Sequence, residues 1–296
     1  MKRREFLSKT ALGLGGAWIG SSSLTALASK TTTQFGATDI VTLGKSGIKT
    51  TRLAMGTGTS GSNHSSNQAK LGLQGLSDLL WAGYDHGLRF IDCADSYGTH
   101  PHVKEALKRI PRDKVAILTK SWNRDADGMR ADLDRFRKEL NVDQIDIVLM
   151  HCLTDSDYDN VNNVEWTTRY RPAMDVLSEA KERGIIRAHG CSCHSIGALR
   201  AAAKSPWVEV DLARLNPIGA HMDAGPETVL SVLREMRAAG KGIVGMKILA
   251  QGDMRQRQDE ALQYALSHDV LDAFTIGAEN RDEQSDLIRR IAAVRI

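Results

Sequence analysis

Short apolar runs alternate with segments of helical spacing along most of this chain, and this alternation limits the possible folds more than any other feature. Each run is short enough to be a buried strand, and the segments between the runs repeat their apolar residues every three or four positions, as amphipathic helices do. The runs cover residues 52–57, 88–93, 115–120, 145–151, 186–193, 210–216, 242–249 and 273–278. Eight strand–helix units in a chain of 296 residues predict an α/β protein of the closed (β/α)₈ TIM barrel type.

An open, doubly wound sheet is the rival arrangement, and the segment after the first run argues against it. A dinucleotide-binding sheet of that kind carries a G-x-G-x-x-G loop there that opens a helix. Residues 56–61 read Gly-Thr-Gly-Thr-Ser-Gly and have this spacing, but no clear helix opens after them. Ahead of the first run, residues 40–50 have the pattern of two short strands about a glycine turn. We expect this β-hairpin to close the bottom of the barrel.

The N-terminal residues are typical of an export signal. Arg3 and Arg4 stand in a basic start, a mild apolar run covers 11–20, and residues 26–28 read Ala-Leu-Ala, the A-x-A pattern of a cleavage site. The paired arginines before a Phe-Leu step resemble a twin-arginine signal. This resemblance implies the twin-arginine export machinery as a partner and an exported, periplasmic or other extracytoplasmic location.

The predicted organisation is therefore a signal peptide at 1–28, a Ser/Thr-rich linker at 29–38 and one barrel domain at 39–296. The apolar run of the signal is too short for a stable membrane span, which takes ~20 apolar residues. The net charge of +3 comes without a clustered basic segment, so the sequence makes no case for nucleic acid as a partner.

The four cysteines lie in or beside apolar runs, which predicts buried free thiols. They are Cys93, Cys152, Cys191 and Cys193. The spacing of the last two does not fit a C-x-x-C redox motif, and no second pair completes a zinc site. We therefore expect no metal.

Polar residues stand at, or just beyond, the C-terminal ends of three successive runs. Asp92 and Tyr97 follow the second run, Lys120 ends the third, and His151 ends the fourth. In a parallel barrel the strand ends on this face share one mouth. A phenol, an ammonium, a carboxylate and an imidazole that converge there can deliver a proton to a carbonyl oxygen, as hydride transfer to an aldehyde or ketone requires.

Each of these residues has its own expected role. The ammonium of Lys120 is expected to lower the pKa of Tyr97 from its usual value near 10, so that the phenol acts as general acid and base. Asp92 would keep Lys120 charged and oriented, and His151 would bond the same carbonyl oxygen. Taken singly, each residue also has a structural explanation, such as an Asp that bonds nearby amides in a turn.

At these residues the chain resembles the aldo-keto reductase family. The motifs that carry the resemblance are Asp92-x-Ala94-x-x-Tyr97-Gly98, Thr119-Lys120 and Met150-His151, together with 43–48 and 55–58 for the opening hairpin and first strand. The resemblance implies a barrel that binds a nicotinamide dinucleotide, usually NADP(H), with NAD(H) possible. It also implies reversible interconversion of a small-molecule carbonyl and its alcohol, which includes sugars.

The same resemblance implies where the dinucleotide would be held. The cofactor-binding residues that it indicates are Gly56, Thr57, Ser192, Asn216, Met246, Lys247, Gly277, Asn280, Arg281 and Gln284. Physically, a helix N-terminus favours phosphate, and Arg281 adds bidentate donors. The carboxylate of Glu279 is unfavourable beside a 2′-phosphate. The resemblance therefore favours NADP(H) but leaves NAD(H) as an alternative.

Three positions depart from the family pattern at the nicotinamide end. Cys193, Leu212 and Ile218 stand where the family has an asparagine, a glutamine and a stacking ring. His194 or Asn216 are the candidates to replace the missing contacts. These departures motivate an alternative function, a non-catalytic nicotinamide-binding sensor or accessory barrel.

A metal-dependent barrel hydrolase is a third hypothesis, because His100 and His102 could offer two ligands. No second His/Asp pair recurs at another strand end, which makes this hypothesis weak. The four polar residues at successive strand ends favour the reductase.

Overall fold

The computed structural model describes residues 34–160, 165–166 and 170–296. The chain divides after Thr32, and every described residue belongs to the second unit, Thr33–Ile296. The predicted export signal and the first residues of the predicted linker lie outside the described residues.

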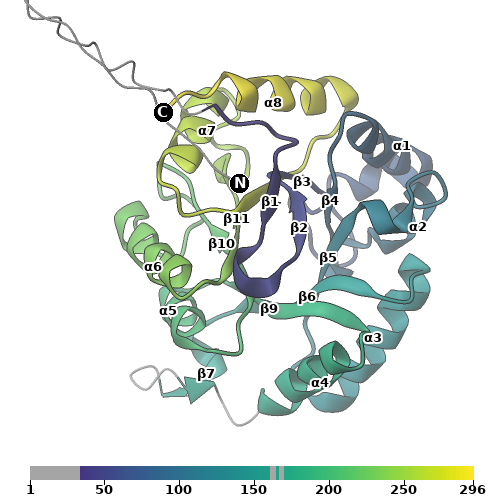
Figure 1. Cartoon of the computed structure of the whole chain (residues 1–296), viewed down its shortest axis with the longest axis vertical. Helices are drawn as coiled ribbons and strands as arrows, with labels where there is room; N and C mark the ends of the chain where they lie inside the picture. The colour runs from purple at the N-terminus through teal and green to yellow at the C-terminus, as the bar shows by residue number, and fades with distance from the viewer. Residues whose placement is uncertain (1–33, 161–164, 167–169) are drawn as a thin grey trace, which may run out of the picture. The chain divides into compact units, whose positions relative to one another are not determined.

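Eight parallel strands close into a barrel, as the sequence predicts (Figure 1). The barrel strands, in order around the barrel, are β3 (Leu53–Gly56), β4 (Phe90–Asp92), β5 (Ala116–Ser121), β6 (Ile145–Leu153), β9 (Ile186–Cys193), β10 (Val210–Arg214), β11 (Gly242–Met246) and β12 (Ala273–Ile276). Strand β12 pairs with β3 and so completes the ring. A short antiparallel pair, β7 (Tyr158–Asn160) and β8 (Glu165–Trp166), lies in the long loop after β6.

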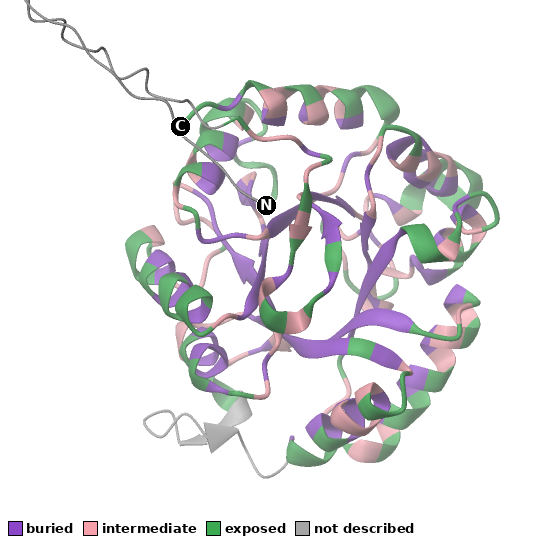
Figure 2. Cartoon of the chain, in the orientation of Figure 1, coloured by how far each residue is buried: buried purple, intermediate pink, exposed green. Residues whose placement is uncertain are grey.

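Helices form the outer layer and turn their apolar stripes toward the strands (Figure 2). They are α1 (Gly72–Asp85), α2 (His100–Ala106), α3 (Ala126–Leu140), α4 (Arg171–Glu182), α5 (Ile196–Lys204), α6 (Pro226–Ala238), α7 (Gln258–Ser267) and α8 (Arg281–Ala293). Helix α3 shows how the sequence sets the start, the buried face and the end of such a helix. Asp125 caps its start by accepting a hydrogen bond from Gly128 N, Met129, Leu133 and Phe136 recur on one buried face, and Asn141 ends it in the left-handed conformation.

The predicted hairpin closes one end of the barrel. It consists of β1 (Ile40–Thr42) and β2 (Lys49–Thr51), which pair antiparallel and lie across the barrel opening in Figure 1. Leu43 and Ile48, between the two strands, are fully buried in the same cluster as the inward-facing residues of the barrel. Gly44 has φ +47°, and a Cβ there would lie 2.3 Å from the carbonyl carbon of Lys241, so the tight approach to the start of β11 requires glycine.

The last residues of the predicted linker pack on the barrel. Ala37 is buried and its carbonyl accepts a hydrogen bond from Leu53 N, while the Arg52 guanidinium lies 5.0 Å from the centre of the Phe35 ring. These contacts carry the packed structure back to residues just before β1.

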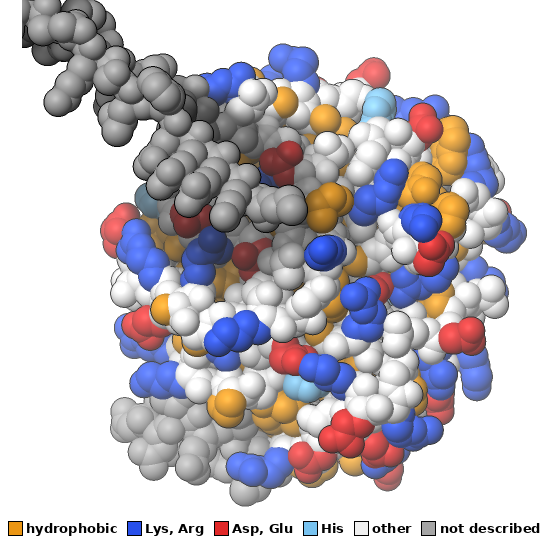
Figure 3. All heavy atoms as spheres, in the orientation of Figure 1, with side chains coloured by type: hydrophobic (Ala, Val, Ile, Leu, Met, Phe, Trp, Pro, Cys, Tyr) orange, Lys and Arg blue, Asp and Glu red, His pale blue; other side chains and the backbone are white. Residues whose placement is uncertain are grey.

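Basic and acidic side chains are interspersed on the visible part of the face in Figure 3, as the alternating charges in the sequence suggest. Within the described ranges, no helix combines the length and apolar character needed to cross a bilayer.

Candidate active site

A cavity of about 1030 Å³ opens among the C-terminal ends of the barrel strands. Asp92, Tyr97 and His151 line it, and Trp122, which follows β5, is a further part of the wall. Lys120 does not line the cavity, because its side chain is fully buried behind the wall. The structure thus brings the four predicted catalytic residues together, three on the surface of the cavity and one beneath it.

Lys120 and Asp92 form a buried ion pair on adjacent strands. The distance from Lys120 Nζ to Asp92 Oδ1 is 2.5 Å, and the same ammonium donates to the carbonyl oxygen of Cys93 at 2.8 Å. Burial alone would lower the pKa of Lys120, but the charge of Asp92, with Tyr97 beside it, raises this pKa above its ordinary value. The ammonium therefore stays charged in the interior.

Tyr97 lies against this pair. Its ring centre is 4.7 Å from Lys120 Nζ, and it ends a short 3₁₀ turn, Asp95–Tyr97, that follows β4. Burial raises the pKa of Tyr97 to about 12, while Lys120 acts in the opposite direction and Asp92 adds to the rise. The sequence predicted a lowered pKa for this phenol. The effect of Lys120 has the predicted direction, but burial outweighs the ammonium, so the net pKa is raised and Tyr97 is a neutral phenol at ordinary pH.

His151 closes the reactive end of the cavity. Its ring stands edge-on to Tyr97 with the centres 5.7 Å apart, and the ring of Trp122 lies 5.2 Å away. Burial, and then the positive charge of Lys120, hold the pKa of His151 well below its usual range. The imidazole is therefore neutral and can donate an N–H to an oxygen without carrying charge.

The glycine-rich stretch 56–61 packs on Tyr97. A Cβ added at Gly58 would lie 2.2 Å from the Tyr97 ring, and one at Gly61 would lie 2.3 Å from it. Side chains at these positions would displace the phenol, so the glycines allow the backbone to cover one face of the ring. This packing explains two glycines of the segment by their contact with Tyr97 rather than by a phosphate-binding turn.

The predicted cofactor residues divide into three groups. In the first, Gly56, Met246, Lys247 and Gly277 line the cavity. Lys247 has φ +55°, and its ammonium donates to Gln251 Oε1 at 3.1 Å. Burial, and then the charge of Arg214, lowers its pKa.

The second group is buried beside the cavity without lining it. Thr57 donates to the carbonyl oxygen of Asp92 at 2.9 Å, and Ser192 Oγ accepts a hydrogen bond from Cys152 N at 2.9 Å. Asn216 donates to the carbonyl oxygens of Ala220 and Lys247. These hydrogen bonds hold the loops of the mouth together. Asn216 Oδ1 is buried without a hydrogen-bond partner among the described residues, so this oxygen is free to accept a bond.

The third group lies at the start of α8. Asn280 caps the helix by accepting from Glu283 N at 2.8 Å, Arg281 is exposed and does not line the cavity, and Gln284 borders a small separate cavity behind the wall. The cavity is lined here instead by Glu279 and Glu283, with Arg255 opposite. Arg255 donates to Glu283 at 2.6 Å, so cation and carboxylate compensate each other.

Two residues of the cavity wall were not predicted as a pair. Cys152 follows His151, has the strained value φ +56°, and lies 3.3 Å from His194 Nε2 through its sulfur. Both line the cavity. Burial lowers the pKa of His194 to about 4 and raises that of Cys152 to about 11, so the pair is neutral. The position of Cys152 directly after a predicted catalytic residue was the available signal.

The departures from the family pattern do not share one surface. Cys193 is fully buried and lies outside the cavity lining, Leu212 is packed in the barrel interior, and Ile218 is 42% exposed. Of the two candidate replacements, His194 lines the cavity and Asn216 does not.

The histidines considered as metal ligands are placed elsewhere. His100 bonds Glu139 and Thr119, each at 2.7 Å, and neither His100 nor His102 lines the cavity. The hydrolase hypothesis therefore gains no support from the reactive end of the cavity.

The fold and the four clustered residues define the class of protein, which is an α/β barrel with its reactive groups at the C-terminal strand ends. The sequence model of the Aldo/keto reductase family matches residues 52–293. The chain belongs to the aldo/keto reductase family.

Curated relatives are similar over part of their length. An aldehyde reductase of Saccharomyces cerevisiae is 26% identical over 194 residues, 58% of either chain. A methylglyoxal reductase of Yersinia pestis is 33% identical over 122 residues, 40% of this chain and 39% of that protein. Aldo-keto reductase family 1 member A1 of Homo sapiens is 28% identical over 123 residues, 36% of this chain and 38% of that protein. The matches thus span less than two thirds of each relative.

Solved structures share the fold over nearly their full length. An aldo-keto reductase of Bacillus halodurans in its holo form superposes with a TM-score of 0.67 at 17% identity, covering 86% of this chain and 90% of that one. A glycerol dehydrogenase of Gluconobacter oxydans gives 0.64 at 16% identity, covering 85% and 90%. At this identity the likeness concerns the fold.

Proposed function

We propose that the protein is an oxidoreductase that interconverts a carbonyl compound and its alcohol, with a nicotinamide dinucleotide as hydride carrier. The observation that carries the proposal is a neutral phenol, Tyr97, on the wall of a large cavity and against the buried Lys120–Asp92 pair. Family membership supports the reaction class. Two relatives are named for the reduction of aldehydes and of methylglyoxal, which supports a small carbonyl substrate.

The residues along the cavity fit an extended dinucleotide. Met246, Ile248 and Leu249 supply apolar surface, and the Lys247 ammonium supplies charge for a phosphate. Thr275 lines the same cavity, and its Oγ1 is buried without a hydrogen-bond partner in the described residues. An unused hydroxyl on the wall is suited to a polar ligand atom. We propose NADP(H) as cofactor, with NAD(H) as the alternative; when bound, it would supply or accept the hydride.

The chain's own groups would move the proton. In reduction, Tyr97 would donate its proton to the carbonyl oxygen, and Lys120 would stabilise the phenolate left behind. Asp92 would hold Lys120 in place. His151, as a neutral imidazole, would donate a hydrogen bond to the same oxygen and orient the substrate. In alcohol oxidation the phenolate would act as the base.

A titration of the purified chain with NADPH and with NADH, followed by protein fluorescence, tests the cofactor separately from turnover. Consumption of the reduced nicotinamide in the presence of small aldehydes tests the reaction. We expect micromolar binding and turnover. If dinucleotide binds but no carbonyl in an aldehyde and ketone panel is reduced, the non-catalytic nicotinamide-binding barrel becomes the better function; absence of binding contradicts both.

We also propose that the chain is exported through the twin-arginine route, on the pattern of Arg3, Arg4 and residues 26–28. Changing both arginines to lysine should leave an uncleaved chain in the cytoplasm, as seen by fractionation and intact mass. Normal export of that variant would contradict the proposal.

A further inference from the structure

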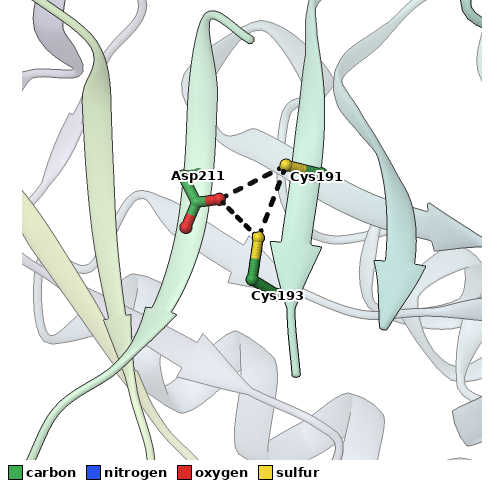
Figure 4. Close-up of side chains that lie close together, drawn as sticks. All are labelled: Cys191, Cys193 and Asp211. Atoms are coloured by element: carbon green, nitrogen blue, oxygen red, sulfur yellow. Dashed lines mark hydrogen bonds between the residues drawn. The ribbon is translucent and has the colours of Figure 1, made fainter. Parts of the chain in front are cut away.

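A second group of polar side chains lies in the barrel wall, outside the active-site cavity. Cys191 and Cys193 lie on β9, and Asp211 approaches them from the adjacent strand β10 (Figure 4). All three are fully buried, and none of them lines the cavity. Leu212, the neighbour of Asp211, belongs to the interior cluster, whereas both cysteines belong to the cluster between strands and helices. The group therefore faces the helical layer.

The donor atoms of the three residues form a compact triangle. The two sulfurs are 3.8 Å apart, and Asp211 Oδ2 lies 3.3 Å from the sulfur of Cys191 and 3.4 Å from that of Cys193. A tetrahedral zinc ion with its usual bond lengths would place two sulfurs about 3.8 Å apart and sulfur and oxygen about 3.5 Å apart. The spacing of the triangle is thus close to that of a thiolate–carboxylate zinc site.

Asp211 has a further donor atom to offer. Its Oδ1 is buried and has no hydrogen-bond partner in the described part of the chain. Buried carboxylate oxygens are normally bonded, because desolvation without a partner is costly. The nearby cation, Lys241, donates to the carbonyl oxygens of Ser205 and Val208 instead. Two weak thiol donors therefore leave the carboxylate only partly satisfied, and a cation would complete it.

The other compact group of possible ligands behaves differently. Asp95, His100 and Glu139 also lie close together, but Arg135 donates to both carboxylates, and His100 bonds Glu139 and Thr119. Its charges and hydrogen bonds are satisfied within the protein. This contrast singles out the cysteine–aspartate group.

We infer that Cys191, Cys193 and Asp211 bind a thiophilic divalent cation, with Zn²⁺ as the occupant. Two thiolates and Asp211 Oδ2 give three donor atoms in a fully buried site, and a second oxygen of Asp211 would make four, the number typical of a structural ion. The ion would tie β9 to β10 directly beneath the segment that carries Ser192 and His194. The sequence predicted no metal, because no second Cys pair follows; the third ligand proposed here comes from the next strand.

Zinc binding would release the thiol protons. In the metal-free chain, burial raises the pKa of Cys191 to about 11 and that of Cys193 well above its usual range. Because the bound form needs both thiolates, the apparent affinity for Zn²⁺ should increase with pH.

The experiment uses the full chain, purified without an affinity tag from cells grown with added Zn²⁺. We expect one zinc per chain by inductively coupled plasma mass spectrometry. After chelation and addition of Co²⁺, we expect a thiolate-to-cobalt charge-transfer band, which an oxygen-only or adventitious site does not give. Zinc should also raise the unfolding temperature of the chelated chain.

The variants Cys191→Ser and Asp211→Asn should abolish the cobalt band or reduce it strongly. Cys93→Ser is the matched control, because Cys93 is also a buried free thiol but lies outside β9 and β10 and donates to the carbonyl oxygen of Leu118. Circular dichroism establishes that each variant folds. The wild-type measurements keep the inference testable if a variant does not.

Three results would overturn the inference. The first is a wild-type chain without stoichiometric zinc and without a thiolate–cobalt band. The second is a band that survives both ligand variants. The third is thiol titration of the denatured, unreduced chain that finds two thiols fewer than the four present, since Cys191 and Cys193 would then be joined as a disulfide.

Discussion

The β4–β6 sector and the β9–β10 sector of the barrel each carry a cluster of buried polar residues, but the two clusters lie on opposite faces of the wall. In the first sector, the side chains of Lys120 and Asp92 are on the same side of the sheet as the interior residue Leu118, and they pair behind the cavity. In the second sector, the side chains of Cys191 and Asp211 are on the other side of the sheet and meet beneath the helices. Successive side chains along a strand alternate between the two sides of the sheet. A shift of one residue therefore decides whether a polar group faces the barrel interior and its mouth or the helical layer.

The largest effect is expected when the pair of the first sector is broken. Lys120→Met leaves Asp92 buried and uncompensated, so we expect a loss of unfolding free energy of about 3–5 kcal/mol and of most activity. Chemical denaturation and turnover measure the two effects. Asp92→Asn should do less harm to activity if Asp92 only orients Lys120. Equal stability of wild type and Lys120→Met would show that the pair does not hold this sector together.

Removal of the phenol oxygen should act on chemistry alone. Tyr97→Phe keeps the ring against Gly58 and Gly61, so dinucleotide binding and stability should change little, while turnover should fall by ~10²-fold or more. Single-turnover kinetics with a small aldehyde, alongside fluorescence titration, separate the two. Undiminished hydride transfer would remove Tyr97 from the proposed mechanism.

Substitutions at the end of β9 test whether its cysteines face away from the cavity, as their position in the strand indicates. Cys193→Asn introduces the family's residue, but the side chain at this position does not line the cavity. We expect unchanged dinucleotide affinity and a loss of stability of about 1–3 kcal/mol, because the larger amide would be buried without a full set of hydrogen-bond partners. His194→Ala, on the cavity wall, should instead change affinity. Tighter binding by Cys193→Asn would mean that residue 193 contacts the nicotinamide.

The smallest effect is on the pH dependence of stability. The pKa of His194 is about 4 in the folded chain and near 6.5 when unfolded. The unfolded state therefore binds more protons between these values, and the contribution of neutral His194 is complete above pH 6.5 and lost as the pH falls toward 4. Urea midpoints measured across this range should decline less steeply in His194→Gln. Parallel curves would show that His194 titrates normally in the fold.

The sequence by itself determined the architecture and the reactive cluster. Eight buried runs at regular intervals permit few arrangements other than a closed parallel barrel, and polar residues at the ends of adjacent strands must meet at one mouth. The four residues from Asp92 to His151 follow from these two rules. The burial of the cysteines was also predicted from their apolar surroundings, and Cys152 alone is partly exposed.

The tertiary structure alone decided which side chains were already engaged. Thr57 and Ser192 stand at suitable positions in the chain, yet their hydroxyl groups are bonded to neighbouring loops, and the amide nitrogen of Asn216 is bonded likewise. Arg214 is on the same side of β10 as the interior residue Leu212 and forms an ion pair with Asp223. The sequence did not predict this ion pair. The net shift in the pKa of Tyr97 and the meeting of Cys191 with Asp211 likewise depend on packing across strands far apart in sequence. Periodicity reports which face of an element is buried, but hydrogen-bond partners and desolvation are set by side chains that only the closed barrel brings into contact.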